Sequence, residues 1–373
     1  MSPGKHTRYG QIVMSIKKEI HDIWLSRSIT AQGSVRLENF IRLSRNLSNH
    51  TFPIQTTAAK RHKIALKIQE ALKTIPNFDQ EWIRLAWDKC SLQERALLQH
   101  LCQLEYPCEE LQIYCNLKTN IFIIVNDGDA LHIQTGSSTN TLSDLWQVLD
   151  DLDTTLSQTL TYAFDATKGF ATSNPSNLGT GLDIKVTLHL PGLCFNQKLN
   201  QTNEALQIMH LKLDAVISKQ NNALGHLFCL NNRIAFGCSE NDLIQHIDKI
   251  AEEIVAQEKQ LRNDILQHQP NFVKDSICRS IGLLKNCYEL TYEESMNLIS
   301  VVSLGINLGI LSNYKKEALI LLWRSMHVDM LREFCGKDFD SSEENRVRAD
   351  IVRSHFSEFE DCFAFQKEDV HVS

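Results

Sequence analysis

The stretch GFATSNPSNLGTGL at residues 169–182, followed directly by DIKVTLHL at 183–190, decides how the chain folds. Its first part is rich in Gly, Asn, Ser and Pro, which favour turns, so it predicts a loop. In the second part the apolar residues at even positions alternate with polar residues, as in a half-buried strand. The sequence therefore predicts a glycine-rich loop that runs into a strand of a sheet.

Further strand and helix patterns lie on both sides of this stretch. Short β-rich runs occupy 111–117, 121–125 and 130–134, with an Asn-Asp-Gly-Asp turn at 126–129, and 211–217 and 226–230 are further strand candidates. Apolar residues at helical spacing predict helices over 12–26, 58–74, 143–158 and 241–265. The stretch between residues 26 and 58 is polar and irregular, and residues 271–357 carry helical patterns alone.

Runs of strands followed by runs of helices are typical of α+β proteins or of separate domains. We therefore expect an α+β fold, with a mostly antiparallel sheet flanked by helices in a domain at 1–266. An all-helical module at 270–373 should follow it.

Composition limits what the chain can do. Among its 373 residues, 38 Lys and Arg face 45 Asp and Glu, and the formal net charge of −7 argues against nucleic-acid or anionic-membrane binding. No apolar run is long enough to span a bilayer, and the charged N-terminus lacks a signal-peptide core, so we expect a cytoplasmic protein. The 11 cysteines form no CxxC pair, so we expect neither a metal site nor a disulfide framework.

Four blocks of sequence, in the expected order, resemble the phosphagen (guanidino) kinases. They are FIRLSRNL at 40–47, NDGDALHI at 126–133, the stretch at 169–182, and ALGHLFCLNN at 223–232 followed by GCSE at 237–240. The family patterns are R-I-R-L-A-R-N-L, N-E-E-D-H-L-R-I, T-x-x-P-x-N-L-G-T-G-L-R and A-x-G-x-x-F-x-x-S-N with G-x-S-E. The HLPGL continuation at 189–193 and the helical tail are most similar to the bacterial protein-arginine kinases. The resemblance implies the phosphagen-kinase fold for the first domain.

The resemblance also implies a chemistry, namely phosphoryl transfer from ATP with magnesium to a guanidinium group. Such transfer depends on positioning and charge neutralisation, which the family achieves with a ring of arginines and a glutamate. Here the arginine positions hold Phe40, His132, Asp183 and Asp214, and the glutamate position holds Gly128, so we expect no catalytic residue. Losing one positioning arginine costs a factor of about 10³ or more in phosphoryl transfer. The resemblance with these replacements predicts a pseudokinase that binds no cofactor.

Some nucleotide-site positions keep the family's residue. These remnants are Arg42, Arg45, Asn177, Gly179, Thr180, Gly181 and, as a nearby cation, Lys185. We expect Arg42 to be a relic phosphate contact and Arg45 to support the loop. An alternative is that Lys185 and Lys219 replace lost arginines, which would leave a working kinase with a rearranged site and ATP with magnesium as its cofactor.

Two other polar sets have plain structural readings. The polar residues of the strand (Asp183, Lys185, Thr187 and His189) should form a solvated or cleft-lining face. Asp127 and Asp129 should belong to a hairpin turn, although they could instead bind a guanidinium.

The helical tail adds three expectations. In the protein-arginine kinases it carries an R-D-x-x-R-A phosphoarginine pocket, which here corresponds to ENRVRA at 344–349 and leaves Arg348, with Arg346 or Arg353, as a possible contact. A phosphoarginine reader is therefore a further alternative, although a solvated helix face is the simpler reading. The apolar stripe of Met296, Ile299, Val302 and Ile306, together with the block at 303–309, predicts a homodimer. The resemblance implies a role in protein quality control, with a zinc-binding activator protein and a Clp-type unfoldase as partners.

Overall fold

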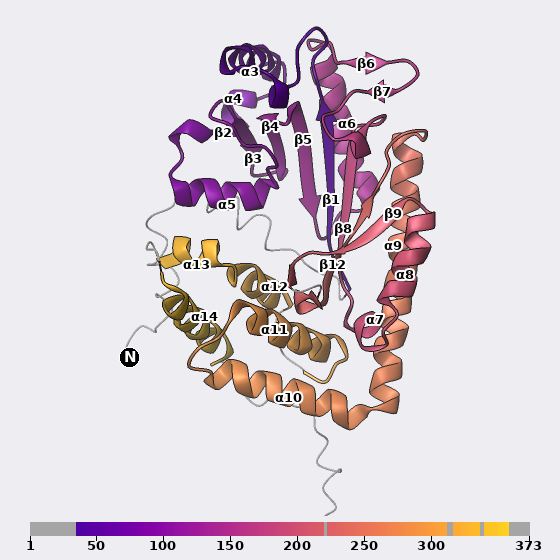
Figure 1. Cartoon of the computed structure of the whole chain (residues 1–373), viewed down its shortest axis with the longest axis vertical. Coiled ribbons are helices and arrows are strands. Elements are labelled where there is room, and N and C mark those ends of the chain that lie inside the picture. The colour runs from indigo at the N-terminus through magenta and orange to yellow at the C-terminus, as the bar shows by residue number, and fades with distance from the viewer. Residues whose placement is uncertain (1–34, 220–221, 312–315, 336–338, 358–373) are drawn as a thin grey trace, which may run out of the picture.

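The computed structural model describes residues 35–219, 222–311, 316–335 and 339–357. The helix expected over 12–26 lies outside these ranges. The chain has the α+β fold that the sequence predicts, with a mostly antiparallel sheet flanked by helices and a helical region after it (Figure 1). None of the helices within the described ranges is long and apolar enough to cross a membrane.

Eight antiparallel strands form the main sheet in the order β2-β3-β4-β5-β1-β8-β12-β9. In that order the strands are β2 (Trp82–Ala86), β3 (Gln112–Asn116), β4 (Ile121–Asp127), β5 (Asp129–Ser137), β1 (Arg36–Arg45), β8 (Leu182–His189), β12 (Leu227–Asn232) and β9 (Leu211–Ala215). Two small ribbons are added by β6 (Phe164–Asp165) with β7 (Gly169–Phe170), and by β10 (Ser218–Lys219) with β11 (Asn222–Ala223). The strand expected after the glycine-rich loop is β8, at the centre of the sheet.

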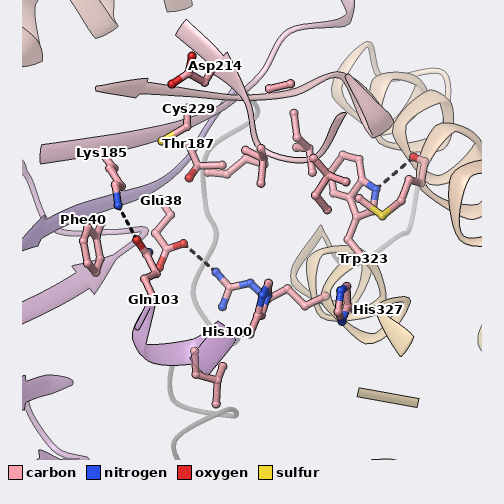
Figure 2. A pocket seen from close by; sticks show the side chains of 18 of the residues that line it. Glu38, Phe40, His100, Gln103, Lys185, Thr187, Asp214, Cys229, Trp323 and His327 are labelled. Atoms are coloured by element: carbon pink, nitrogen blue, oxygen red, sulfur yellow. Dashed lines mark hydrogen bonds and ion pairs between the residues drawn. The ribbon is translucent and has the colours of Figure 1, made fainter. Parts of the chain in front are cut away.

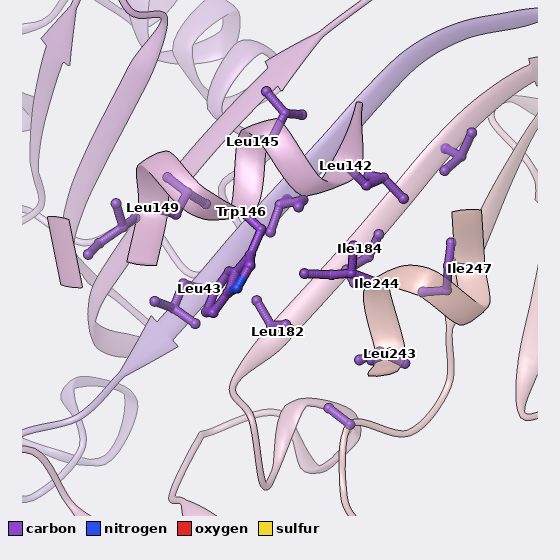
Figure 3. Packing of buried hydrophobic residues seen from close by; sticks show 14 of the residues in the cluster. Leu43, Leu142, Leu145, Trp146, Leu149, Leu182, Ile184, Leu243, Ile244 and Ile247 are labelled. Atoms are coloured by element: carbon purple, nitrogen blue, oxygen red, sulfur yellow. The ribbon is translucent and has the colours of Figure 1, made fainter. Parts of the chain in front are cut away.

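Helices α3 (Ala58–Leu72), α6 (Leu142–Ser157) and α9 (Glu240–His268) cover one face of the sheet. Figure 3 shows Trp146 of α6 and Ile244 of α9 packed against Leu43, Leu182 and Ile184 of the central strands. These residues are at most 9% exposed. This face holds the main core, because apolar side chains on alternate strand positions meet the apolar stripes of the three helices.

The opposite face of the sheet is covered in two parts. Helix α5 (Leu92–Cys102) packs over β3 and β4, and the C-terminal helices pack beside the ends of β1, β8 and β12 (Figure 1). They are α10 (Pro270–Asn286), α11 (Tyr292–Asn307), α12 (Lys316–Ser325), α13 (Val328–Cys335) and α14 (Ser341–Phe356). Shorter elements are α4 (Phe78–Glu81), α7 (Pro191–Phe195), α8 (Leu199–Ile208) and the 3-10 turns η1 (Pro53–Gln55), η2 (Trp87–Lys89), η3 (Pro175–Asn177) and η4 (Leu224–His226).

The stretch between 26 and 58, which lacks a regular pattern, contains strand β1, so the expectation of an irregular segment there was wrong. Strand β1 pairs with β5 on one side and β8 on the other, and most of its residues are buried on both faces. Its polar residues Asn39, Arg42, Ser44 and Arg45 are buried with hydrogen bonds, so the sequence does not alternate between apolar and polar.

The apolar stripe that predicted a dimer packs inside its own module. Met296, Ile299, Val302 and Ile306 are at most 9% exposed and belong to the core formed by α10, α11, α12 and α14. Gly305, within the second block cited for the dimer, faces Ile277 of α10, where a Cβ would lie only 3.0 Å from two carbon atoms of that side chain. Both features are explained by packing within one chain, so dimerisation stays a prediction.

Candidate functional site

The glycine-rich loop keeps its sequence because its backbone is packed tightly. Gly179 and Gly181 have positive φ angles of 107° and 76°, which L side chains rarely adopt. A Cβ at Gly179 would lie 2.7 Å from the carbonyl oxygen of Ala235, and one at Gly181 would lie 2.6 Å from that of Ser44. These glycines are therefore required by the fold itself, whether or not a phosphate is bound.

Arg45 holds the same loop from beneath. Its guanidinium donates to Asp153 Oδ2 at 2.8 and 3.1 Å and to the carbonyl oxygen of Thr180 at 2.9 Å. It also lies 3.5 Å from the centroid of the Phe170 ring. The side chain is 2% exposed. This placement agrees with the expectation that Arg45 supports the loop.

A cleft of ≈ 610 Å³ lies between the second face of the sheet and the C-terminal helices (Figure 2). Its floor is formed by residues of β1, β8, β12 and β9, and its walls by α5 on one side and α11, α12 and α13 on the other. Of the predicted site positions, Phe40, Lys185 and Asp214 line the cleft, and Asp183 reaches it through Lys185. The loop residues Asn177, Gly179, Thr180 and Gly181 are not among those that line it.

The two acidic replacements are each paired with a lysine two residues away. Lys185 Nζ lies 3.0 Å from Asp183 Oδ2, and Lys212 Nζ lies 2.6 Å from Asp214 Oδ2. Lys185 also donates to Gln103 Oε1 at 2.8 Å and lies 5.5 Å from the centroid of the Phe40 ring. The charges at Asp183 and Asp214, two of the positions where the family carries arginines, are therefore locally neutralised. A third such position holds the aromatic ring of Phe40.

The remaining charges around the cleft are also neutralised. Arg324 of α12 donates to Glu38 of β1 at 3.0 Å, which joins the C-terminal helices to the sheet. Burial raises the pKa of Cys229 on the cleft floor to about 12, so its thiol is neutral and donates to Asn231 Oδ1 at 2.8 Å. The site therefore combines paired charges with a largely apolar lining.

The turn at 126–129 is a tight hairpin whose polar groups are used internally. Gly128 has a φ of +77°, and a Cβ there would lie 2.9 Å from Tyr106 Cδ2. The Asp127 carboxylate accepts from the backbone N–H groups of Glu105 and Tyr106, at 2.7 to 3.2 Å. Asp129 accepts from Asn46 and from the backbone of Ser173, both at 2.6 Å. The hairpin reading is confirmed, and a guanidinium would have to displace these donors.

His132, at another arginine position, is locked in the interior. Its Nε2 lies 2.7 Å from the carbonyl oxygen of Asp127, and its Nδ1 lies 2.9 Å from Ser44 Oγ. Because a carbonyl oxygen only accepts, Nε2 carries a proton, and Nδ1 hydrogen-bonds with the Ser44 hydroxyl. Both ring nitrogens are satisfied by the fold.

Two expected cations are engaged elsewhere. Arg42 is 2% exposed, and its guanidinium donates to Gln134 and to the carbonyl oxygens of Cys102 and Gln103. A phosphate contact through Arg42 would break these bonds, so its placement contradicts that expectation. Lys219 pairs with Glu293 of α11 at 2.7 Å, on the surface.

The three tail arginines named above are all engaged by groups of the same chain. Arg348 is 2% exposed and donates to the carbonyl oxygens of Leu290 and Met326 and to Asn345 Oδ1, all within 3.1 Å. It is thus neither a solvated residue nor an available phosphoarginine contact. Arg346 pairs with Glu289, and Arg353 pairs with Asp350 and bonds the carbonyl oxygen of Cys287.

A buried polar network joins the sheet to the C-terminal helices, and the sequence analysis did not identify it. Arg262 of α9 donates to Glu258 and to the carbonyl oxygen of His189, each at 2.6 Å. Ser300 Oγ of α11 lies 2.8 Å from His189 Nε2 and 2.7 Å from His226 Nδ1. His189 is 0% exposed and is not among the residues that line the cleft, so the expectation of a solvated or cleft-lining face was wrong for this residue. A glutamate and an arginine four residues apart in an otherwise apolar stripe were the signal available in the sequence.

No group of three or more His, Cys, Asp or Glu side chains within the described ranges is arranged to hold a metal ion. The cleft's cations Lys185, Lys212 and Arg324 each already contact a carboxylate. The residues present therefore do not fit a magnesium–triphosphate group without rearrangement.

The fold and the loop together define a class of protein. Residues 68–261, just over half of the chain, match the family model described as ATP:guanido phosphotransferase, C-terminal catalytic domain, so the chain belongs to this family. Residues 270–367 match the model described as Protein-arginine kinase McsB C-terminal domain.

Curated relatives and solved structures agree with this assignment. The chain is 29% identical over 337 residues to a protein-arginine kinase of Clostridium acetobutylicum, covering 89% of this chain and 98% of that protein. It is 27% identical over 348 residues to one of Brevibacillus brevis, covering 91% of this chain and 97% of that protein.

Among solved structures, lombricine kinase is similar with a TM-score of 0.54 at 16% identity, covering 69% of this chain and 76% of that one. The duplicated taurocyamine kinase of Schistosoma mansoni gives a TM-score of 0.56 at 21% identity, covering 65% of this chain and 36% of that longer one. These structures share the fold.

Proposed function

We propose that this member of the family is a pseudokinase that transfers no phosphate and acts by binding other proteins. The observation that carries the proposal is the pairing on the cleft floor, where Asp183 and Asp214 occupy arginine positions and neutralise Lys185 and Lys212. A triphosphate would meet two carboxylates where relatives offer guanidinium groups. A pair of like charges 4 Å apart costs on the order of 4 kcal/mol at an effective dielectric constant near 20.

The position of the family's glutamate supports the same proposal. Gly128 offers no carboxylate to orient a guanidinium, and its positive φ and the close Tyr106 ring leave little room for a side chain. The replaced positions lie along neighbouring central strands, since His132 pairs with Ser44 of β1 and Asp183 pairs with Arg42 of β1.

We place this activity in cytoplasmic protein quality control, with a homodimer as the working form. Resemblance to the protein-arginine kinases supports a zinc-binding activator protein and a Clp-type unfoldase as partners. Co-purification from native cytosol tests the partners, and light scattering tests the dimer.

A second candidate is a working protein-arginine kinase with a rearranged site. It is favoured by the coverage of relatives that bear this name, which extends over 89% and 91% of the chain. In this case Lys185 and Lys212 would have to leave their carboxylates and bind the triphosphate instead.

Thermal melting with MgATP separates the two functions. A working site at a nucleotide concentration 100 times its Kd adds about 2.7 kcal/mol of stability, which is a shift of several degrees. We expect no shift, and no acid-labile phosphate on an unfolded arginine-rich protein. Phosphate that appears with the parent chain and disappears in Thr187→Trp, which fills the cleft, would establish the working kinase instead.

A further inference from the structure

The cleft has the volume of a small-molecule pocket, and its lining favours an apolar occupant. Its ≈ 610 Å³ falls in the range of ligand pockets, and Leu101, Leu227, Met296 and Trp323 are among the side chains that line it. Val216, also in the lining, is 45% exposed, so the apolar surface continues onto the lip. Because the cations of the lining already contact carboxylates, the cleft favours an uncharged surface over an anion.

The chain enters the described structure at the edge of this cleft. The carbonyl oxygen of Val35 accepts from the backbone N–H of His189 at 2.8 Å, which fixes where the chain joins the sheet. Leu37 and Glu38, two and three residues further on, line the cleft. The 34 residues that precede Val35 are therefore tethered at the cleft.

Those preceding residues include a segment with matching chemistry. Residues 12–26 (IVMSIKKEIHDIWLS) carry isoleucines at 12, 16, 20 and 23 and a tryptophan at 24, which fall on one side of a helix. Its two lysines are balanced by one glutamate and one aspartate. The segment is therefore amphipathic and, like the cleft, has its charges balanced.

The tether is long enough for the segment to reach the cleft. Residues 27–34 connect the two, and eight residues span at most about 28 Å when extended. A short flexible connection of this kind gives an effective concentration in the millimolar range, so weak contacts suffice for docking. An amphipathic helix that lays its apolar side into a groove is a recurring mode of recognition.

We propose that residues 12–26 of the same chain dock in the cleft through their apolar side. The cleft of this protein is then occupied by its own N-terminal segment. This goes beyond the proposed pseudokinase function, and its test contains no nucleotide, so the two can fail separately.

Limited trypsin digestion of the full chain tests the docking, with cleavage after Lys17 and Lys18 followed by mass spectrometry. Each rate is divided by that of a free peptide with the same sequence. Thr187→Glu places a charge on the cleft floor, and Thr154→Glu places the same charge on the exposed side of α6, across the sheet. Ile20→Asp disrupts the apolar side of the segment, and Ser15→Asp is its matched control on the polar side.

Cleavage follows the undocked population when docking is fast, so we expect at least about tenfold faster cleavage in Thr187→Glu and in Ile20→Asp. The parent and both controls should stay protected. Equal rates in all five proteins would overturn the proposal. Faster cleavage in Ile20→Asp while a folded Thr187→Glu stays protected would also overturn it, because the segment would then dock elsewhere. Protection that is lost on dilution would assign the segment to a second copy and overturn docking within one chain.

Discussion

Replacing Arg45 by alanine should show that hydrogen bonds within the chain stabilise the glycine-rich loop at 169–182. The substitution removes two hydrogen bonds to Asp153 and one to the carbonyl oxygen of Thr180, together with the contact on the Phe170 ring. Asp153, which is 7% exposed, would be left as a buried charge without its cation. Breaking a buried pair in this way costs about 3–5 kcal/mol.

Chemical denaturation measures this loss, and for a chain of this length thermal melting should show a decrease of about 5 °C. The matched control is Arg346→Ala, because Arg346 also pairs with a carboxylate, that of Glu289, but its side chain is 53% exposed. An exposed pair contributes up to about 1 kcal/mol. Removing both charges with Arg45→Met and Asp153→Leu should recover part of the stability, since no buried charge then remains. If Arg45→Ala cost no more than Arg346→Ala, the structural role of this arginine would be refuted.

Three further outcomes are expected. The double substitution Asp183→Asn with Asp214→Asn removes the carboxylates that neutralise Lys185 and Lys212. MgATP should therefore raise the melting temperature of this variant and not that of the parent. No rise in either protein would contradict the inference that these carboxylates prevent nucleotide binding. Gly128→Glu alone should not switch on phosphorylation. It should lower the free energy of unfolding by about 1 kcal/mol or more, because the φ of +77° disfavours a side chain. A gain of phosphorylation would favour the working kinase. Burial, assisted by the nearby Arg262, lowers the pKa of His226 to about 4, so the unfolded chain takes up a proton below its ordinary pKa of about 6.5 while the folded protein does not. From His226 alone, stability should therefore fall by roughly 3 kcal/mol between pH 6.5 and 4. His226→Asn should reduce this dependence without removing it, because burial also lowers the pKa of His189. An unchanged urea midpoint over that range would contradict the prediction.

Local patterns were sufficient for the elements around the loop. Strand β8 alternates cleanly because one face meets α6 and α9 while the other faces the cleft, and the hairpin at Gly128 follows from its turn residues. Pairing of Asp183 with Lys185 could also have been predicted, since residues two apart in a strand share a face. The pattern fails at β1, where buried arginines are satisfied by groups far away in the sequence.

The walls of the cleft depend on contacts that no local pattern encodes. Arg324 and Glu38 are separated by 286 residues, and Met330 of α13 packs into the cluster around α5. The arginines expected to touch phosphate were identified by motif position alone, and a motif does not say which donors the fold has already used. Arg42 and Arg348 are the examples, since both donate to backbone carbonyl groups of the fold.

The buried network around Arg262 has a consequence for how the molecule can be divided. Two family models meet near residue 266, yet His189 and Ser300 bond across that boundary, and Leu224 and Leu227 from the sheet side are part of the core of the helical region. Cutting the chain there would remove Ser300 from His189 and His226 and would expose two apolar surfaces at once. The two regions should therefore melt in a single cooperative transition, and a truncated chain ending at 266 should aggregate rather than persist as a smaller folded unit.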